Sequence, residues 1–283
     1  MIDYNFYKII TLTNMHVGSG DINFGVVDNL IQREPASNFP YINSSSLKGA
    51  LREFFVYKNL QNDKIIDIFG SSPQSDKNGK RNNKQGKFYF FNAYILSIPA
   101  RSDIIPYFNA TCPQLLNMFI NTYKTYNRLN DIGKDKISKV ENFLKNINVF
   151  LENGRVLISN KYKDKGSGTV EDLTMKYFED VLIDDADLKN LLGDNIAVLN
   201  DRDFIENISN NMPVIARNYL ENGMSKNLWY EEIVPRDSRF FFIIGSPKDD
   251  NLSNEFSEHV KSEPVQIGAN ASIGYGFCNI EII

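Results

Sequence analysis

One stretch of the chain decides the fold, and it runs Ser44-Ser45-Ser46-Leu47-Lys48-Gly49-Ala50-Leu51-Arg52-Glu53-Phe54-Phe55. Positions 47, 50, 51, 54 and 55 are apolar and follow the i, i+3, i+4, i+7, i+8 spacing that places side chains on one face of a helix. The three serines precede the apolar positions and are candidate N-terminal caps. We therefore expect an amphipathic helix packed on a hydrophobic core.

Strands are expected on both sides of this helix. Tyr4–Thr13 and Phe88–Ile98 are rich in aromatic and β-branched residues. The remaining elements are two strands, Met212–Leu220 and Leu228–Val234, around a loop with Gly223, a helix over Asn251–Ser262, and a last strand with Cys278, Ile280 and Ile282 on one face. The order strand, helix, strands, helix, strand is typical of an α+β fold with a ferredoxin-like βαββαβ core.

The middle of the chain predicts a helical insertion over about 113–206. Helices are expected at Pro113–Leu129 and Lys134–Lys145, and the acidic residues 179–206 are expected to form a solvated helical face. Before the insertion, the polar stretch Lys77–Lys87 carries only basic charges and predicts a loop.

The composition describes a globular protein whose charge alone does not attract nucleic acid. With 42% hydrophobic and 23% charged residues, the 283-residue chain can bury a sizeable core. Its net charge of −4 means that any nucleic-acid partner must be held by a local basic patch. Two cysteines and two histidines make neither a disulfide framework nor a zinc signature. Without a secretory signal or a long apolar stretch, the protein is expected to be soluble and cytoplasmic.

The start of the helix at residue 44 is the best candidate site for an anion. Free N–H groups and the positive end of the helix dipole meet serine hydroxyls there. Lys48 and Arg52 lie one turn apart on a single face, an arrangement that suits a phosphodiester backbone. The alternative is a capped surface helix with two solvated cations.

Two glycine-rich loops, over residues 16–25 and 267–276, permit close approach of the backbone to a ligand. Neither is a dinucleotide-binding fingerprint, because each leads into an extended segment. Asp28 follows the first loop within an apolar run, where it could ligate a divalent cation or accept a proton, or could simply be a turn residue. His16 could be an acid, a base or a phosphate contact, or be structural.

In combination, these motifs resemble the RAMP superfamily of CRISPR proteins. The resemblance rests on residues 16–20 (His-Val-Gly-Ser-Gly), 25–28 (Gly-Val-Val-Asp), 31–34 (Ile-Gln-Arg-Glu), 39–42 (Phe-Pro-Tyr-Ile), 45–52 and 68–70 (Ile-Phe-Gly). Residues 99–102, 111–113, 228–232 (Leu-Trp-Tyr-Glu-Glu) and 267–276 are similar to the repeated backbone subunit of the type III-B effector, the Cmr complex. The equivalent type III-A (Csm) subunit lacks the same Trp-Tyr-Glu-Glu stretch.

The resemblance implies a single RAMP domain over 1–283. An RRM-like palm would comprise about 1–110 and 235–283, a helical insertion about 113–206, and a protruding β-thumb about 208–232. Copies would stack in a filament along a CRISPR guide RNA, together with other subunits of the effector complex and away from membranes. Each thumb would flip a base pair of the guide–target duplex aside, and each copy would cut the complementary target RNA once.

The resemblance also implies roles for particular residues. Asp28 corresponds to the catalytic carboxylate and ligand of a divalent cation, Mg or Mn, in cleavage by 2′-hydroxyl attack. Candidate supporting residues are His16, Tyr230, Glu231 and Glu232, and candidate RNA-binding residues are Ser45, Ser46, Lys48, Arg52, Gly268, Asn270 and Gly274. The sequence departs from the family pattern at Asn43, where a flexible residue is usual, and at Leu30, where a proline is common.

Two alternatives remain open beside an RNA-guided endoribonuclease. The first is a backbone subunit that only binds and spaces the guide, and the aspartate at position 28 favours cutting over this reading. The second is a standalone guide-processing ribonuclease, whose chemistry usually needs a histidine-centred acid–base pair. A single His16 in a glycine loop supports it poorly.

Overall fold

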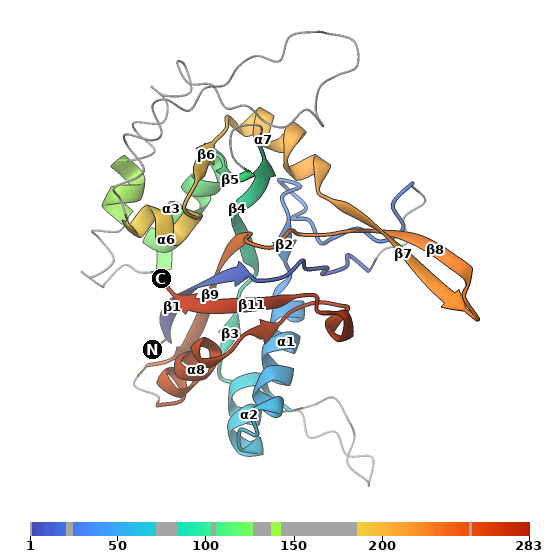
Figure 1. The fold of residues 1–283 in the computed structure, drawn as a ribbon. Helices are drawn as coiled ribbons and strands as arrows, with labels where there is room; N and C mark the ends of the chain where they lie inside the picture. The colour runs from blue at the N-terminus through green and yellow to red at the C-terminus, as the bar shows by residue number, and fades with distance from the viewer. Residues whose placement is uncertain are drawn as a thin grey trace.

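The computed structural model describes residues 2–20, 25–71, 84–102, 106–126, 137–142, 186–248 and 251–283. The fold mixes helices with one large sheet and a separate two-stranded hairpin (Figure 1). Most of the basic stretch Lys77–Lys87 and much of the expected insertion lie outside the described residues. Among the described residues, no helix is long and apolar enough to cross a membrane.

The centre of the sheet has the strand order β11-β1-β9-β4, and each neighbouring pair is antiparallel. These strands are β1 (Ile2–Thr11), β4 (Ala93–Arg101), β9 (Arg239–Pro247) and β11 (Phe277–Ile282). With the helices α1 (Ser44–Tyr57) and α8 (Asn251–Ser262), the chain order is β1, α1, β4, β9, α8, β11. The expected α+β class is confirmed, and these six elements follow the βαββαβ order.

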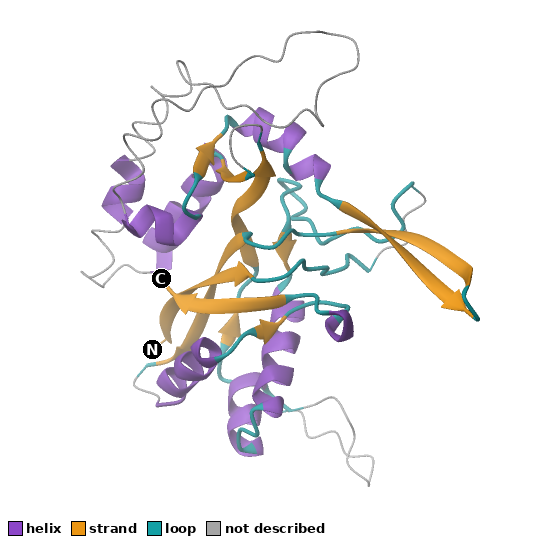
Figure 2. Cartoon of the chain, viewed as in Figure 1, coloured by secondary structure: helices purple, strands orange, loops and turns teal. Residues whose placement is uncertain are grey.

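Three short strands extend the sheet, and a second helix, α2, lies below α1 in Figures 1 and 2. The predicted strand Phe88–Ile98 consists of two strands. β3 pairs with β9, residues 91–92 are not in a strand, and β4 then begins and also pairs with β9. The short elements are β2 (Tyr41–Ile42), β3 (Tyr89–Phe90), β10 (Val265–Gln266) and helix α2 (Asn62–Phe69).

Strand β9 is the centre of the core because both of its faces are covered. Phe240 and Phe242 belong to the cluster that includes α1 and α8, whereas Phe241 belongs to the cluster that includes the helix α3 (Pro113–Tyr126). Within the first cluster, the rings of Phe242 and Tyr7 stack, with their centroids 5.1 Å apart. A strand buried on both faces is a continuous apolar run, as this one is.

The described part of the insertion differs in part from the expected solvated helical face. Helix α6 (Ala186–Leu192) buries three leucines, and strand β6 (Ile196–Val198) is buried and pairs in parallel with β5 (Tyr107–Thr111). Helix α7 (Asp201–Asn207) follows, and residues 137–142 are also helical. The prediction for 179–206 is confirmed in part, because α6 and α7 are helices whose acidic side chains are exposed or half-buried. It is wrong at β6, which is a buried strand, and at the three leucines of α6, which join the core.

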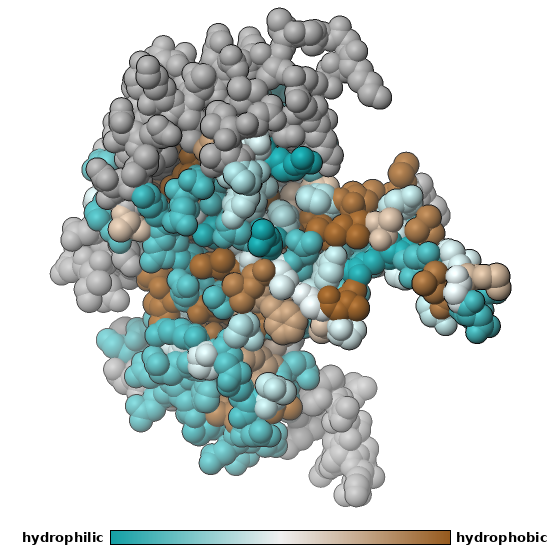
Figure 3. All heavy atoms as spheres, in the orientation of Figure 1, coloured by the Kyte–Doolittle hydropathy of each residue, from teal (hydrophilic) through white to brown (hydrophobic). Residues whose placement is uncertain are grey.

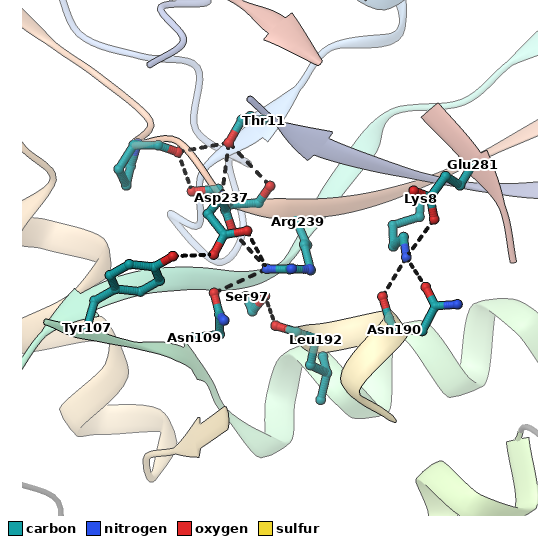
Figure 4. A network of polar contacts seen from close by, with 12 residues as sticks. Lys8, Thr11, Ser97, Tyr107, Asn109, Asn190, Leu192, Asp237, Arg239 and Glu281 are labelled. Carbon is teal, nitrogen blue, oxygen red and sulfur yellow. Dashed lines mark hydrogen bonds and ion pairs between the residues drawn. The ribbon is translucent and has the colours of Figure 1, made fainter. Parts of the chain in front are cut away.

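Buried polar contacts tie this region to the sheet (Figure 4). The Arg239 guanidinium donates to Asn109 on β5 (3.2 Å) and to the Asp237 carbonyl (2.9 Å). Lys8 on β1 donates to the Asn190 carbonyl of α6 and pairs with Glu281 of β11 at 3.1 Å. The sheet and the inserted elements are thus joined by charges as well as by apolar packing.

The hairpin of β7 (Val214–Glu221) and β8 (Met224–Glu232) protrudes to the right of the sheet in Figure 1. Asn222 and Gly223 connect the strands, with φ of 51° and 78°. This geometry suits a two-residue hairpin turn, so the connection is shorter than the expected loop. Brown, hydrophobic atoms are visible on the hairpin in Figure 3. The large hydrophobic residues that are exposed on it are Val214, Tyr219, Leu220, Met224, Leu228 and Tyr230.

Candidate functional site

Asp28 lies in a loop that is bonded to β8 at the base of the hairpin. The N–H groups of Asp28 and Asn29 both donate to the carbonyl oxygen of Tyr230, each over 3.1 Å. In return, the N–H of Tyr230 donates to the Asp28 carboxylate over 2.7 Å. Asp28 is exposed. Its carboxylate is therefore oriented by the backbone and accessible to a bound molecule.

His16 and Glu232 are buried behind this loop, with exposures of 6% and 5%. The His16 Nδ1 lies 2.7 Å from the Glu232 carbonyl, to which it donates in the matching tautomer. The Glu232 carboxylate accepts from the Ile31 N–H at 3.1 Å and from Arg33 at 2.5 Å. These contacts hold the segment after Asp28 against β8 from the interior.

Glu231 is buried and surrounded by donors from three elements. Its carboxylate accepts from Trp229 Nε1 (2.9 Å), Arg217 Nε (3.0 Å) and Asn270 Nδ2 (3.0 Å). Burial acts to raise its pKa, but the Trp229 hydrogen bond and the charges of Arg217 and His16 outweigh burial. The pKa of Glu231 is therefore below its ordinary 4.5, and the group is ionised at neutral pH.

The glycine loop 267–276 packs against the His16 segment. The Ala269 N–H donates to the His16 carbonyl over 2.8 Å. At Gly268, with φ of 93°, a Cβ would lie 2.4 Å from that carbonyl oxygen, so only glycine allows the approach. Asn270 follows in the left-handed region, φ 67°, and from there its amide reaches Glu231.

Helix α1 is capped by Asn43 rather than by the serines. The Asn43 side-chain oxygen accepts from the Ser45 N–H at 2.9 Å and from the Ser45 hydroxyl at 2.8 Å. The expectation that the serines act as caps is wrong, because they form the first turn of the helix itself. The departure from the family pattern at Asn43 thus provides the cap.

Gln32 joins the start of α1 to the loop that carries Asp28. Its amide nitrogen donates to the Ser46 hydroxyl (3.0 Å) and to the Gly18 carbonyl (3.2 Å). Its oxygen accepts the Asn43 N–H over 2.7 Å. In the sequence, Gln32 stands out only as part of the motif at 31–34. Nothing in the local pattern shows that its side chain spans these segments.

Lys48 and Arg52 are half-buried on α1 and have partners in the fold. Lys48 Nζ lies 5.7 Å from the centre of the Phe90 ring, and Arg52 donates to the Gly70 carbonyl over 2.6 Å. The reading of two freely solvated cations is therefore wrong for Arg52. Gly274, in contrast, is exposed, with φ of 82° and open space around it.

At the hairpin base, Asp28 is the carboxylate that could hold a divalent cation. Within the described ranges, no group of three or more histidine, cysteine or acidic side chains could hold a metal ion. Glu231 and Glu232 accept bonds from Arg217 and Arg33, which leaves Asp28 as the exposed carboxylate. Mg²⁺ is commonly bound by one or two carboxylates together with substrate phosphates.

The fold brings most of the predicted site residues together, but not all of them. His16, Asp28, Tyr230–Glu232, Gly268 and Asn270 form one connected cluster at the hairpin base. Ser46 is linked to it through Gln32, whereas the side chains of Lys48 and Arg52 contact Phe90 and Gly70 instead. Arg217 and Arg33, which hold the two glutamates, were not singled out from the sequence.

The sequence also matches a known protein family. The model of the RAMP superfamily matches residues 8–279. The chain belongs to the RAMP superfamily. A curated RAMP relative, the CRISPR system Cmr endoribonuclease Cmr4 of Pyrococcus furiosus, is 29% identical over 97% of this chain and 94% of its own length.

Solved structures show the same fold. A chain of the type III-B Cmr-beta cryo-EM structure bound to cognate target RNA matches 99% of this RAMP chain and 96% of its own, with a TM-score of 0.68 and 18% identity. Oligomeric Cmr4 from Pyrococcus furiosus matches 100% of this chain and 98% of its own, with a TM-score of 0.66 and 22% identity. The predicted resemblance to the type III-B Cmr backbone subunit is confirmed.

Proposed function

We propose that this protein is a guide-RNA-binding backbone subunit of a type III-B CRISPR effector that stacks in a filament and cuts complementary target RNA. The observation that carries the proposal is the position of Asp28. Its exposed carboxylate is held by the Tyr230 backbone at the base of a protruding hairpin. The likeness to a Cmr endoribonuclease over nearly the whole chain supports it.

In this proposal the large sheet with α1 and α8 is the RRM-like palm, over about 1–110 and 235–283 of a single domain. The segment 113–206 is the insertion, and the hairpin within about 208–232 is the thumb. The exposed apolar side chains of the hairpin suit a surface that enters a guide–target duplex and displaces a base pair. The base of the hairpin then brings Asp28 to the displaced nucleotide.

The chemistry proposed at Asp28 is proton transfer at a ribose. The carboxylate accepts the proton of the 2′-hydroxyl, and the 2′ oxygen forms a bond to the adjacent phosphorus. The bond from phosphorus to the 5′ oxygen breaks, and that oxygen takes up a proton from water. The products are a cyclic phosphate and a 5′-hydroxyl. Hydrogen bonding from Tyr230 N–H keeps the carboxylate in one orientation during this transfer.

A divalent cation, Mg or Mn, is proposed to be held by Asp28 together with RNA phosphates. When bound, it would neutralise phosphate charge. The partners proposed are the guide RNA, the target RNA, other copies of the chain and the other subunits of the effector, in the cytoplasm. Ser45, Ser46, Lys48, Arg52 and the loop residues Gly268, Asn270 and Gly274 are the proposed RNA contacts.

Asp28→Asn tests the function. Asparagine keeps a side-chain oxygen for the Tyr230 N–H but cannot accept the proton, so the loop geometry is retained while the chemistry is lost. We expect target cleavage by the guide-loaded complex to fall by at least ~100-fold, with unchanged guide binding. The exposed Asp63→Asn on α2 is the control and should cut normally. Normal cutting by Asp28→Asn would refute the assignment.

A non-cleaving backbone subunit is the second candidate. The observation in its favour is that Glu231 and Glu232 are paired with arginines. Asp28 is then the exposed acidic group of the cluster, without a second exposed carboxylate among the described residues of that cluster. The same assay separates the two. If the parental complex binds guide and target but cuts neither with Mg²⁺ nor with Mn²⁺, the non-cleaving reading is correct.

A further inference from the structure

Three side chains close a contact between the hairpin and the C-terminal glycine loop. Arg217 on β7 pairs through Nε with the Glu231 carboxylate on β8 at 3.0 Å, and Asn270 of the loop donates to the same oxygen at 3.0 Å. The Arg217 guanidinium also lies 4.4 Å from the centre of the Tyr275 ring in that loop. We call Arg217, Glu231 and Asn270 the clasp.

The strand register places the clasp on one face of the hairpin. Arg217 lies opposite Trp229, and Glu231 lies two residues further along β8 on the same side. Trp229 also donates to Glu231, so the carboxylate has donors from β7, β8 and the glycine loop. The side chains of Arg217 and Glu231 are only 15% and 8% exposed. A nearly buried ion pair with added hydrogen bonds and a stacked ring is geometrically specific.

The clasp lies one residue from the backbone that carries Asp28. Tyr230 makes three backbone-mediated contacts with the Asp28 loop, and Glu231 is its direct neighbour in β8. The N–H of Glu232 on the other side donates to the Asn29 carbonyl over 2.9 Å. Any rotation of β8 against the glycine loop would therefore move Asp28 relative to a target held by the rest of the protein.

We infer that Arg217 is a positioning residue, which acts through Glu231 and the glycine loop to fix the Asp28 carboxylate for cutting. This inference rests on the proposed function. It also gives Glu231 a different role from acid–base support, since three donors already engage its carboxylate. Because misplacement of a catalytic group by about 1 Å can cost on the order of 100-fold in rate, the loss of the clasp should be visible in the cutting step.

Arg217→Gln in the guide-loaded complex is the main test. We expect the single-turnover rate at saturating target to fall ~10- to 100-fold, with unchanged affinity for guide and target. Hydrogen exchange of the amides of residues 28–29 and 230–232 should become faster, while exchange in β1 and β9 stays the same. Lys261→Gln on α8, which removes only a pair with Glu258 away from the hairpin and is not among the proposed RNA contacts, is the control and should match the parent.

A double-mutant cycle and a second variant distinguish loss of the clasp from general misfolding of Arg217→Gln. Arg217→Gln and Glu231→Gln act on one contact, so the double variant should lose no more rate than the worse single variant. Asn270→Gly keeps the left-handed backbone but removes the amide donor, and should lose rate in the same direction by a smaller factor. Full additivity, or parental rates in Arg217→Gln and Asn270→Gly, would overturn the inference.

The amide-exchange measurement separates this inference from the proposed function. If the parental complex does not cut, the function fails, but faster exchange at residues 28–29 in Arg217→Gln would still support the clasp. If the parent cuts and the exchange in Arg217→Gln equals that of the parent, the clasp is wrong while the function stands.

Discussion

Asp28, Glu231 and Glu232 have the same functional group in three different surroundings. Glu231 and Glu232 are buried, and each faces an arginine, whereas Asp28 is exposed and accepts a backbone N–H. Charged partners hold a buried carboxylate in one position. The exposed carboxylate is the one that a substrate can reach. Burial therefore separates the two arginine-paired glutamates from the accessible carboxylate of Asp28.

Glu231 should contribute to stability in a pH-dependent way. Its folded-state pKa is below its ordinary 4.5, so the contribution is complete above that value and is lost as the pH falls through the folded pKa. We expect Glu231→Gln to melt at a lower temperature than the parent at neutral pH. The difference between the two melting temperatures should become smaller in acid. The charged groups that face this carboxylate are Arg217 on β7 and His16 on the loop after β1.

Thermal melts of the whole chain between about pH 7 and pH 3 measure this difference. The exposed Glu53→Gln on α1 serves as the control and should follow the parent throughout. A Glu231→Gln deficit that is the same at every pH would show that the carboxylate charge is not what stabilises the site.

At this scale, the sequence could predict the residues that lie in motifs but not their partners. Asp28, His16 and Glu231 were found because they stand in short recognisable stretches. Arg217 was missed because its partner Glu231 is 14 residues away across a turn, and because an arginine in a strand has no local signal. Glu231 was expected as catalytic support, which stays a prediction, and its contacts with donors from three elements were not expected. Contacts that depend on strand register are not visible in a linear pattern.

At the scale of elements, hydrophobic periodicity predicted the long helices but not the short buried strand. Helix α8 has the expected limits, and α1 was found from its apolar face. Strand β6 was missed because a short buried strand among carboxylates has no periodic pattern to detect. The cap of α1 was misassigned because Asn43 and the serines that follow are all good caps, and only the backbone angles decide among them.

Helix α1 should bind RNA phosphates in a salt-dependent way. Replacing Lys48 and Arg52 together with Ala should weaken guide binding for all sequences alike and reduce the log–log salt slope by up to about 1.4, since each phosphate contact on a single strand contributes about 0.7. Arg52 also donates to the Gly70 carbonyl, so the double variant should lose some thermal stability as well. Filter binding over a series of salt concentrations measures the slope.

The matched control is Lys64→Ala on α2, whose ammonium is paired with Glu255 at 2.7 Å. It removes a positive charge nearby and should leave the slope close to that of the parent. An unchanged slope in the double variant would mean that α1 is only a capped surface helix.

At the scale of the whole molecule, opposite sides of the protein differ. The hairpin with its exposed apolar residues protrudes on one side, and the inserted elements α3 and α6 lie on the other (Figure 1). Among the six central elements, strand β9 was not predicted, because a continuous apolar run has no alternation that marks it as a strand. The two strands predicted over 212–220 and 228–234 form the hairpin instead. How the inserted elements attach was not predicted either, since it depends on single contacts such as that between Lys8 on β1 and the Asn190 carbonyl of α6.

A molecule with unlike sides should associate head to tail. A contact between two different surfaces repeats along a line and does not close into a pair. We therefore expect assemblies that lengthen with the guide RNA, because each added copy gains a protein neighbour and a further stretch of backbone. The acidic stretch 179–206 and the basic stretch 77–87 remain candidates for part of the contact, although Lys84 and Lys87 already pair with Asp67. Sedimentation with guides of increasing length should show mass rising in steps of one subunit, whereas a dimer of fixed size at every length would contradict the filament and favour a standalone nuclease.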